Sequence, residues 1–105
     1  MTSPPFLPHY IHGQRVAKSD GETFVSSNPA TGEALFEVEH ASEDTLEKAV
    51  NSSKEGQKSW ARATAADRGR ILNRAAALLR EHNDRLATLE VQDCGKPISE
   101  ASAVD

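Results

Sequence analysis

The sequence predicts an α/β fold in which short antiparallel strands are followed by three or four helices. Two observations support this prediction. In residues 9–39, apolar and polar residues alternate in short runs bounded by glycine and proline, which is typical of strands. From residue 42 onward, apolar residues recur at spacings of three and four, which is typical of amphipathic helices. We expect residues 1–8 to form an extended arm and residues 9–105 to form one partial domain.

The first elements are short extended pieces. Residues 1–8 hold three prolines and no periodic pattern, so a loose arm is expected there. The run HYIHGQRV at 9–16 predicts extended backbone on both sides of a turn at Gly13 and Gln14.

A second extended pair flanks the run NPATGE at residues 28–33. One piece begins at Phe24, and ALFEVE at 34–39 alternates as a strand does. Pro29 fixes φ in the intervening run and Gly32 offers a permissive backbone, so this run predicts the connecting turn.

The first helix is expected over residues 43–59. Ser42 precedes it as an N-cap, and Glu43 and Asp44 occupy the first turn, where the helix dipole favours negative charge. Gly56 weakens the last turns. The expected inner face of this helix consists of Leu46, Ala49, Val50 and Ser53.

The segment 64–97 predicts two more helices separated by a polar break. Thr64 and Asp67 match a capping box, with Asp in place of Glu or Gln. Gly95 suits the left-handed conformation at the end, and Pro97 forbids simple continuation. The apolar face, which we expect to be buried, contains Ile71, Leu72, Ala75, Ala76, Leu78, Leu79, Leu86 and Leu89.

These apolar helix faces exceed what a few short strands can cover, because short hairpins are marginal even by themselves. The final run SEASAVD predicts the opening of another helix that the sequence leaves unfinished. We therefore expect an incomplete domain whose covering sheet is encoded downstream; a natural C-terminus is the alternative.

The composition bounds the class of protein. A chain of 105 residues is long enough for one small domain with a modest core, and its 37% apolar and 5% aromatic residues provide few residues for that core. The net charge is −4 and no basic run occurs, which gives no support for nucleic-acid binding. We find neither a membrane-spanning apolar run nor a signal peptide, and one cysteine excludes an internal disulfide. A cytoplasmic protein is expected.

Cys94 is the only thiol in the sequence. Lys96 nearby would favour a thiolate nucleophile. A helix C-terminus and the adjacent Asp93 carboxylate both disfavour a thiolate, and the sequence contains no positioned base. A small space-filling role is the favoured interpretation.

No metal or nucleotide motif is evident. His9 and His12 are close in sequence, but no Cys or carboxylate completes a metal-ligand spacing, so surface or strand positions are expected for them and for His40 and His82. Asp93 could bind a cation together with backbone carbonyls, although an ordinary turn aspartate is the simpler interpretation. The patterns GxGxxG, GxSxG and HExxH and the P-loop are absent, so the residues themselves form no catalytic constellation.

Several segments, taken in order, resemble the N-terminal segment of the aldehyde dehydrogenase family. They are HYIHGQRV, the turn NPATGE, the cap SEDTLEKAV, Trp60 followed by RGRIL, the helix RAAALLREHNDRLATLE and the segment QDCGKPISEASAVD. The resemblance covers about residues 9–105. Within the family the sequence is most similar to betaine aldehyde dehydrogenases, as judged by SKEGQKSWA and RGRILNRAA.

The resemblance implies an enzyme that uses NAD or NADP to oxidise an aldehyde, here betaine aldehyde to glycine betaine. In the family a cysteine thiolate attacks the aldehyde, hydride passes to the nicotinamide, and a glutamate activates the water that releases the acid. Those residues lie beyond Asp105, so the resemblance assigns no catalytic and no cofactor-binding residue here, Cys94 included.

The resemblance also implies a structural setting and a set of partners. In the family this segment belongs to the cofactor-binding domain, and its helices pack on the outside of the dinucleotide-binding sheet. The expected partners are the aldehyde substrate, the remainder of the dehydrogenase fold and further copies in a homo-oligomer. Neither nucleic acid nor a membrane is expected.

A potassium site is implied as well. In betaine aldehyde dehydrogenases it draws on backbone carbonyls and a carboxylate, and the matching positions here are Ser26, Ser27 and Asp93. The family commonly has other residues at the two serine positions. Because carbonyls are the ligands there, side-chain identity matters little.

Two other classes of function stay open. One is a stand-alone helical interaction module without catalysis, which would use the same helices to bind a partner; the unfinished last helix argues against it. The other is a metal-binding or redox protein built on Cys94 and the histidines.

Overall fold

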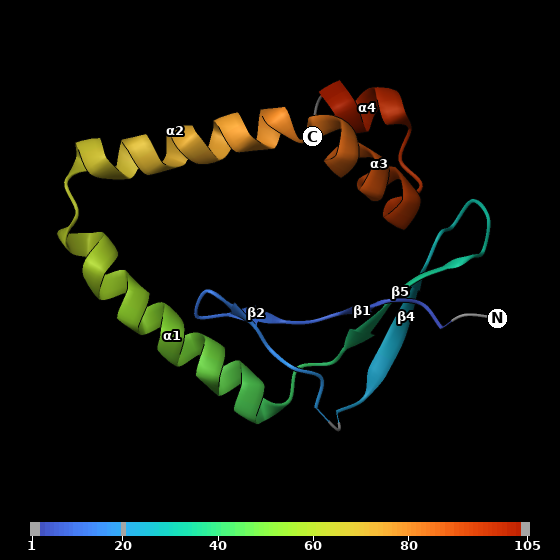
Figure 1. Ribbon diagram of the computed structural model, residues 1–105, viewed down its shortest axis with the longest axis horizontal. Helices are drawn as coiled ribbons and strands as arrows, with labels where there is room; N and C mark the ends of the chain where they lie inside the picture. Colours follow the sequence, from blue (N-terminus) through green and yellow to red (C-terminus); the bar gives the residue numbers. More distant parts are fainter. Residues whose placement is uncertain (1–2, 20, 104–105) are drawn as a thin grey trace. The chain divides into compact units, whose positions relative to one another are not determined.

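The computed structural model describes residues 3–19 and 21–103, and in it strands precede helices as predicted (Figure 1). The chain forms two compact units: one comprises the residues up to Val25 with Phe36–Thr64, and the other comprises Ser26–Leu35 with the residues from Ala65 onward. The strands are β1 (Phe6–Leu7), β2 (Tyr10–Ile11), β3 (Gln14–Arg15), β4 (Thr23–Ser27) and β5 (Ala34–Glu39). The helices are α1 (Glu43–Arg62), α2 (Ala65–Glu81), α3 (Asn83–Cys94) and α4 (Ile98–Ala103).

The larger sheet has the strand order β1-β5-β4. Strand β1 runs parallel to β5, with Phe6 opposite Glu37 and Leu7 opposite Val38. The sequence predicted only antiparallel strands and a loose arm, so this parallel pairing corrects both expectations at residues 6–7. The pairing joins segments about thirty residues apart, and a two-residue strand carries no periodic pattern that could predict it.

Strands β2 and β3 form an antiparallel hairpin in which Tyr10 faces Arg15. Its turn is His12 and Gly13, with φ of 55° and 73°, whereas Gly13 and Gln14 were predicted. A two-residue turn with positive φ at both positions is favoured in hairpins because its backbone twist matches the twist of the two strands. The turn is therefore complete at Gly13, and β3 begins at Gln14. The Tyr10 hydroxyl donates to the Gly13 carbonyl at 2.9 Å and ties the strand to its turn.

The turn predicted at residues 28–33 is confirmed. The Asn28 amide donates to the Glu33 carbonyl at 2.8 Å, and the Gly32 amide donates to the Asn28 carbonyl at 2.7 Å. The Asn28 side chain accepts from the Ala30 amide at 2.9 Å, as turn asparagines do. Gly32 has a φ of 77°, which is the conformation that favours glycine.

Helix α1 begins as predicted, because the Ser42 side chain accepts from the Thr45 amide at 3.1 Å. It ends at Arg62, later than the predicted 59. Gly56 does not stop it, since glycine weakens a helix without clashing with it. Of the predicted inner face, Ala49 is half-buried, but Leu46 and Val50 are 59% and 45% exposed and Ser53 is exposed as well. Thr45 and Ser52 are half-buried instead.

The helices from α2 onward follow the prediction closely. Gly95 ends α3 in the left-handed conformation, at φ 75° and ψ 14°, and its amide donates to the Val91 carbonyl at 2.9 Å. Pro97 stops α3 from continuing and then starts α4, where its carbonyl accepts from the Ala101 amide at 3.1 Å. Helix α4 is the further helix expected near the end of the sequence.

Little of the described chain is buried. The buried residues are Ala87 of α3, Ala101 of α4 and Glu39 of β5. Helices α3 and α4 contact each other through small residues, and the Asn83 side chain donates to the Ser102 carbonyl at 3.0 Å. The α2 face stays exposed, with Leu72 61% and Leu79 60% accessible. This face therefore has no cover among the residues that the structure describes. No helix in the described ranges is long and apolar enough to cross a membrane.

An open apolar depression of about 380 Å³ lies where α2 meets α3. Its lining consists of Ala75, Leu78, Leu79, His82, Arg85 and Leu86.

Candidate functional site

The predicted site residues Ser26 and Asp93 are brought together in the second unit. Ser26 lies near the end of β4 and is half-buried, and Asp93 lies in the last turn of α3 and is exposed. The Ser26 hydroxyl donates a hydrogen bond to Oδ1 of Asp93 across 67 residues of sequence. Ser27 follows Ser26 as the last residue of β4 and is exposed. The structure thus places two of the three predicted residues in direct contact, with the third adjoining them.

A second contact fixes the same two segments. Gly95, just beyond α3, lies so close to the 28–33 turn that a Cβ on it would be 2.9 Å from Cγ of Pro29. Real Cβ contacts are almost never this short, so the approach requires a residue without a side chain. The positive φ at Gly95 imposes the same requirement. The end of α3 is therefore bonded to β4 through Asp93 and lies close to the turn at Gly95.

The chemistry of this cluster suits a hard cation. The oxygens that the structure brings together are the carboxylate of Asp93 and the hydroxyl of Ser26, and Ser27 adjoins Ser26 in β4. The hydrogen bond from Ser26 uses one of the two carboxylate oxygens of Asp93. Oxygen atoms are the ligands that hard cations prefer, and no group of three or more His, Cys, Asp or Glu that could hold a metal ion occurs in the described ranges.

A buried carboxylate in the first unit was missed by the sequence reasoning. Glu39, at the end of β5, is only 5% exposed and accepts hydrogen bonds from the Ser19 hydroxyl and, at 3.2 Å, from the Ser19 amide. These bonds from Ser19 lower the pKa of Glu39, against a smaller opposing effect of burial. Ser19 lies in the polar link KSDGE at residues 18–22, and nothing in that link marks it as the partner of a residue 20 positions away.

A neighbouring ion pair, Lys18 and Glu37, lies beside the contact between Ser19 and Glu39. Lys18 Nζ lies 2.7 Å from Oε1 of Glu37 and 5.3 Å from the centre of the Phe6 ring. The hydrogen bond from Lys18 is the largest cause of a lowered pKa at Glu37. His9 also bears on this region, because its charge adds to the lowering of the pKa of Glu39, while its buried Nε2 has no hydrogen-bond partner among the described atoms. These contacts hold the link and β1 to β5.

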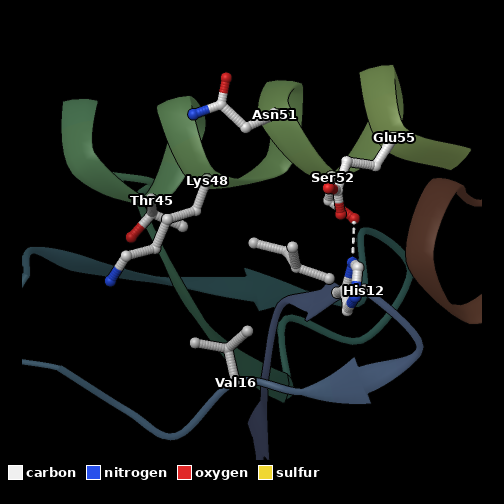
Figure 2. A pocket seen from close by; sticks show the side chains of 8 residues that line it. His12, Val16, Thr45, Lys48, Asn51, Ser52 and Glu55 are labelled. Carbon is white, nitrogen blue, oxygen red and sulfur yellow. Dashed lines mark hydrogen bonds between the residues drawn. The ribbon is translucent and has the colours of Figure 1, made fainter.

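A pocket of about 460 Å³ lies between α1 and the β2–β3 hairpin (Figure 2). His12 Nδ1 and Ser52 Oγ are 2.8 Å apart at one side of it. Lys48 and Glu55 project from α1 at opposite ends of the pocket, and Val16 lies across from the helix (Figure 2). The pocket is open and combines an apolar floor with polar edges. His12 and Ser52 form a hydroxyl–imidazole pair, but among the described residues no third side chain is seen to hydrogen-bond to the imidazole and orient it as a catalytic base.

Each of the remaining candidates makes its own local contacts. Cys94 is exposed, and its Sγ donates to the Glu90 carbonyl at 3.0 Å, as a thiol at the end of a helix does. His40 stacks at a tilt on Phe24, with ring centres 4.8 Å apart. His82 occupies the break between α2 and α3 without a capping side-chain bond. Cys94 is exposed in this chain, which differs from the space-filling role that the sequence favoured.

Three solved structures illustrate what the chain is similar to. A Sinorhizobium meliloti protein provisionally named as a methylmalonate-semialdehyde dehydrogenase, solved with NAD, is 34% identical with a TM-score of 0.89 over 97% of this chain and 21% of its own. A γ-glutamyl-γ-aminobutyraldehyde dehydrogenase from Burkholderia cenocepacia is 34% identical with a TM-score of 0.87, over 93% of this chain and 20% of its own. An aldehyde dehydrogenase from Bacillus cereus, in a G224D variant, is 37% identical with a TM-score of 0.83, over 91% of this chain and 20% of its own.

The chain therefore spans about one fifth of the length of the structures it matches. The family comparison agrees with them: the sequence model described as the aldehyde dehydrogenase family matches residues 16–105. That range includes the turn at 28–33, the Ser26–Asp93 contact and all four helices. By this match the chain belongs to the aldehyde dehydrogenase family.

Proposed function

We propose that this chain is a segment of an NAD(P)-dependent enzyme that oxidises an aldehyde to a carboxylic acid. The match to the family over residues 16–105 carries the proposal. It is supported by similar structures whose names are those of aldehyde-oxidising enzymes, one of them solved with NAD. A bound nicotinamide cofactor would accept the hydride. No residue of this chain is proposed to be catalytic or to bind that cofactor.

The contribution of this chain to such an enzyme is structural. Helix α2 presents Leu72 and Leu79 without cover, and a layer of helices with one open apolar face is stabilised by packing on a sheet. We propose that the remainder of the dehydrogenase fold supplies that cover, and that the complete enzyme is a cytoplasmic homo-oligomer. The isolated chain should then be inactive.

For the substrate we propose betaine aldehyde, which would be oxidised to glycine betaine. The support is the resemblance of SKEGQKSWA and RGRILNRAA to the betaine aldehyde dehydrogenases. The test compares the complete enzyme with the isolated chain by following reduced nicotinamide, with betaine aldehyde and with uncharged aldehydes of similar size. Turnover of betaine aldehyde by the complete enzyme only, with NAD or NADP, is expected. A marked preference for uncharged aldehydes would reject this substrate, and turnover by the isolated chain would reject the structural role.

We also propose that Asp93, together with the backbone carbonyls of Ser26 and Ser27, binds potassium. The contact between Ser26 and Asp93 and the all-oxygen donor set support this site. Potassium should raise the melting temperature of the complete enzyme, and Asp93→Ala should abolish that rise because it removes the only charged ligand. A rise that persists unchanged in Asp93→Ala would place the ion elsewhere. Activity is a separate readout and is not needed for this test.

An interaction module without catalysis is the second candidate, and the open apolar face of α2 favours it. Such a module must fold without the rest of a dehydrogenase. Thermal denaturation of the isolated chain separates the two candidates: a sharp monomeric transition supports a module, whereas a molten or aggregating chain supports the dehydrogenase segment.

A further inference from the structure

The contact between β4 and α3 contains a side-chain bond that carbonyl ligation of an ion does not require. If Ser26 contributed only its backbone carbonyl, its side chain could be any residue that fits a strand. Instead its half-buried hydroxyl donates to Oδ1 of Asp93. Ser26, whose backbone carbonyl is a proposed ligand, thus also restrains the carboxylate of Asp93 through its side chain.

This restraint has a physical consequence. An exposed aspartate at a helix end samples several rotamers, and an ion that needs one of them must select it from the others. The bond from Ser26 holds the Asp93 carboxylate beside the main chain of β4 before any ion arrives. It occupies one oxygen of Asp93 and leaves the second oxygen available as a ligand.

The backbone supports the same arrangement. Because Gly95 allows the end of α3 to approach Pro29 closely, the Ser26 hydroxyl can reach Asp93 without displacement of either segment. We infer that the Ser26 hydroxyl is a positioning group, which orients the Asp93 carboxylate for the cation. The inference rests on the potassium site proposed above and assigns to Ser26 a role beyond that of its carbonyl.

The experiment measures the melting temperature of the complete enzyme against potassium concentration, at constant ionic strength set by a bulky ammonium salt. Ser26→Ala should raise the half-saturating potassium concentration about 10-fold, which is the low end of the effect of losing a group that orients a metal ligand. Ser26→Thr retains a hydroxyl on a residue that suits a strand, and should restore tight binding. Ser53→Ala, the matched control, removes an exposed serine hydroxyl of α1 that belongs to no proposed site, and should behave like the unmodified enzyme.

The outcomes separate this inference from the proposal beneath it. If Ser26→Ala keeps the original half-saturation while Asp93→Ala loses the potassium response, the ion site stands and the positioning role is wrong. If the unmodified enzyme shows no potassium response, both the ion site and the role of Ser26 are wrong. A lowered melting temperature of Ser26→Ala in potassium-free buffer with an unchanged half-saturation would make the bond a structural one, and would also overturn the inference.

Discussion

At the scale of single residues, the functional interest of this chain lies in side chains whose partners are distant in sequence. Asp93 meets Ser26 across 67 positions, and Glu39 meets Ser19 across 20. In each contact a serine hydroxyl donates a hydrogen bond to a carboxylate. Such a bond is stronger than one between two neutral groups, because one partner is charged. Gly95 is of interest for the same reason, because its lack of a side chain allows the end of α3 to lie close to Pro29, near the contact between Ser26 and Asp93.

Gly95→Ala should destabilise the complete enzyme by roughly 1–3 kcal/mol, because a left-handed conformation and a short contact with Pro29 are both forced on alanine. Gly56→Ala is the matched control: Gly56 lies within α1 with open space around it, so alanine should stabilise by up to about 1 kcal/mol. Denaturant titration measures both. Equal effects of the two substitutions would show that neither the left-handed conformation of Gly95 nor its contact with Pro29 carries a cost.

Glu39 should make the enzyme sensitive to acid. Its pKa is lowered in the folded state by the bonds from Ser19, so its stabilising contribution is present above the unfolded-state pKa of about 4.3 and is lost as the pH falls through the lower folded-state value. Glu39→Gln should therefore reduce the melting temperature at neutral pH and reduce it less below about pH 4. The exposed Glu47→Gln is the control and should leave the melting temperature close to the original throughout. A constant difference between Glu39→Gln and the original enzyme across this range would refute the assignment.

At the scale of elements, the residues at which helices and turns begin and end are determined by local sequence, but the side of a helix that packs against its neighbours is not. The Ser42 cap, the 28–33 turn and the Gly95 terminus lie where the sequence predicted them. The inner face of α1 differs, because the small hairpin contacts a polar stripe of the helix and leaves Leu46 exposed. Helix periodicity identifies an apolar stripe, but the neighbouring element decides which stripe it contacts.

Removal of the α1 cap tests the local part of this argument. Ser42→Ala should cost about 1 kcal/mol, because the Thr45 amide loses its acceptor, whereas Ser42→Asp retains an acceptor and should cost little. The apparent free energy of unfolding of the complete enzyme measures the difference. If aspartate proves as damaging as alanine, the contribution of Ser42 is not that of a cap.

At the scale of the whole molecule, the open face of α2 is the main unsatisfied feature. Leu79 is 60% exposed in this chain and lines the apolar depression where α2 meets α3. In the complete dehydrogenase we expect Leu79 to be buried. Leu79→Ala should then cost roughly 2–5 kcal/mol, and Leu79→Met, which conserves volume, less than about 1.5 kcal/mol. A near-zero cost of Leu79→Ala, measured by denaturant titration, would mean that α2 turns a different face to the fold.

The sequence by itself determined the α/β class, the ends of most elements, the turn chemistry and the resemblance to aldehyde dehydrogenases. These depend on neighbours within a few positions, where proline, glycine and capping side chains restrict the backbone directly. Only the tertiary structure decided that β1 pairs parallel with β5, that Ser19 donates hydrogen bonds to Glu39, and that the Ser26 hydroxyl donates one to Asp93. Such contacts join segments 20 to 67 positions apart, and no local preference of either partner specifies the other.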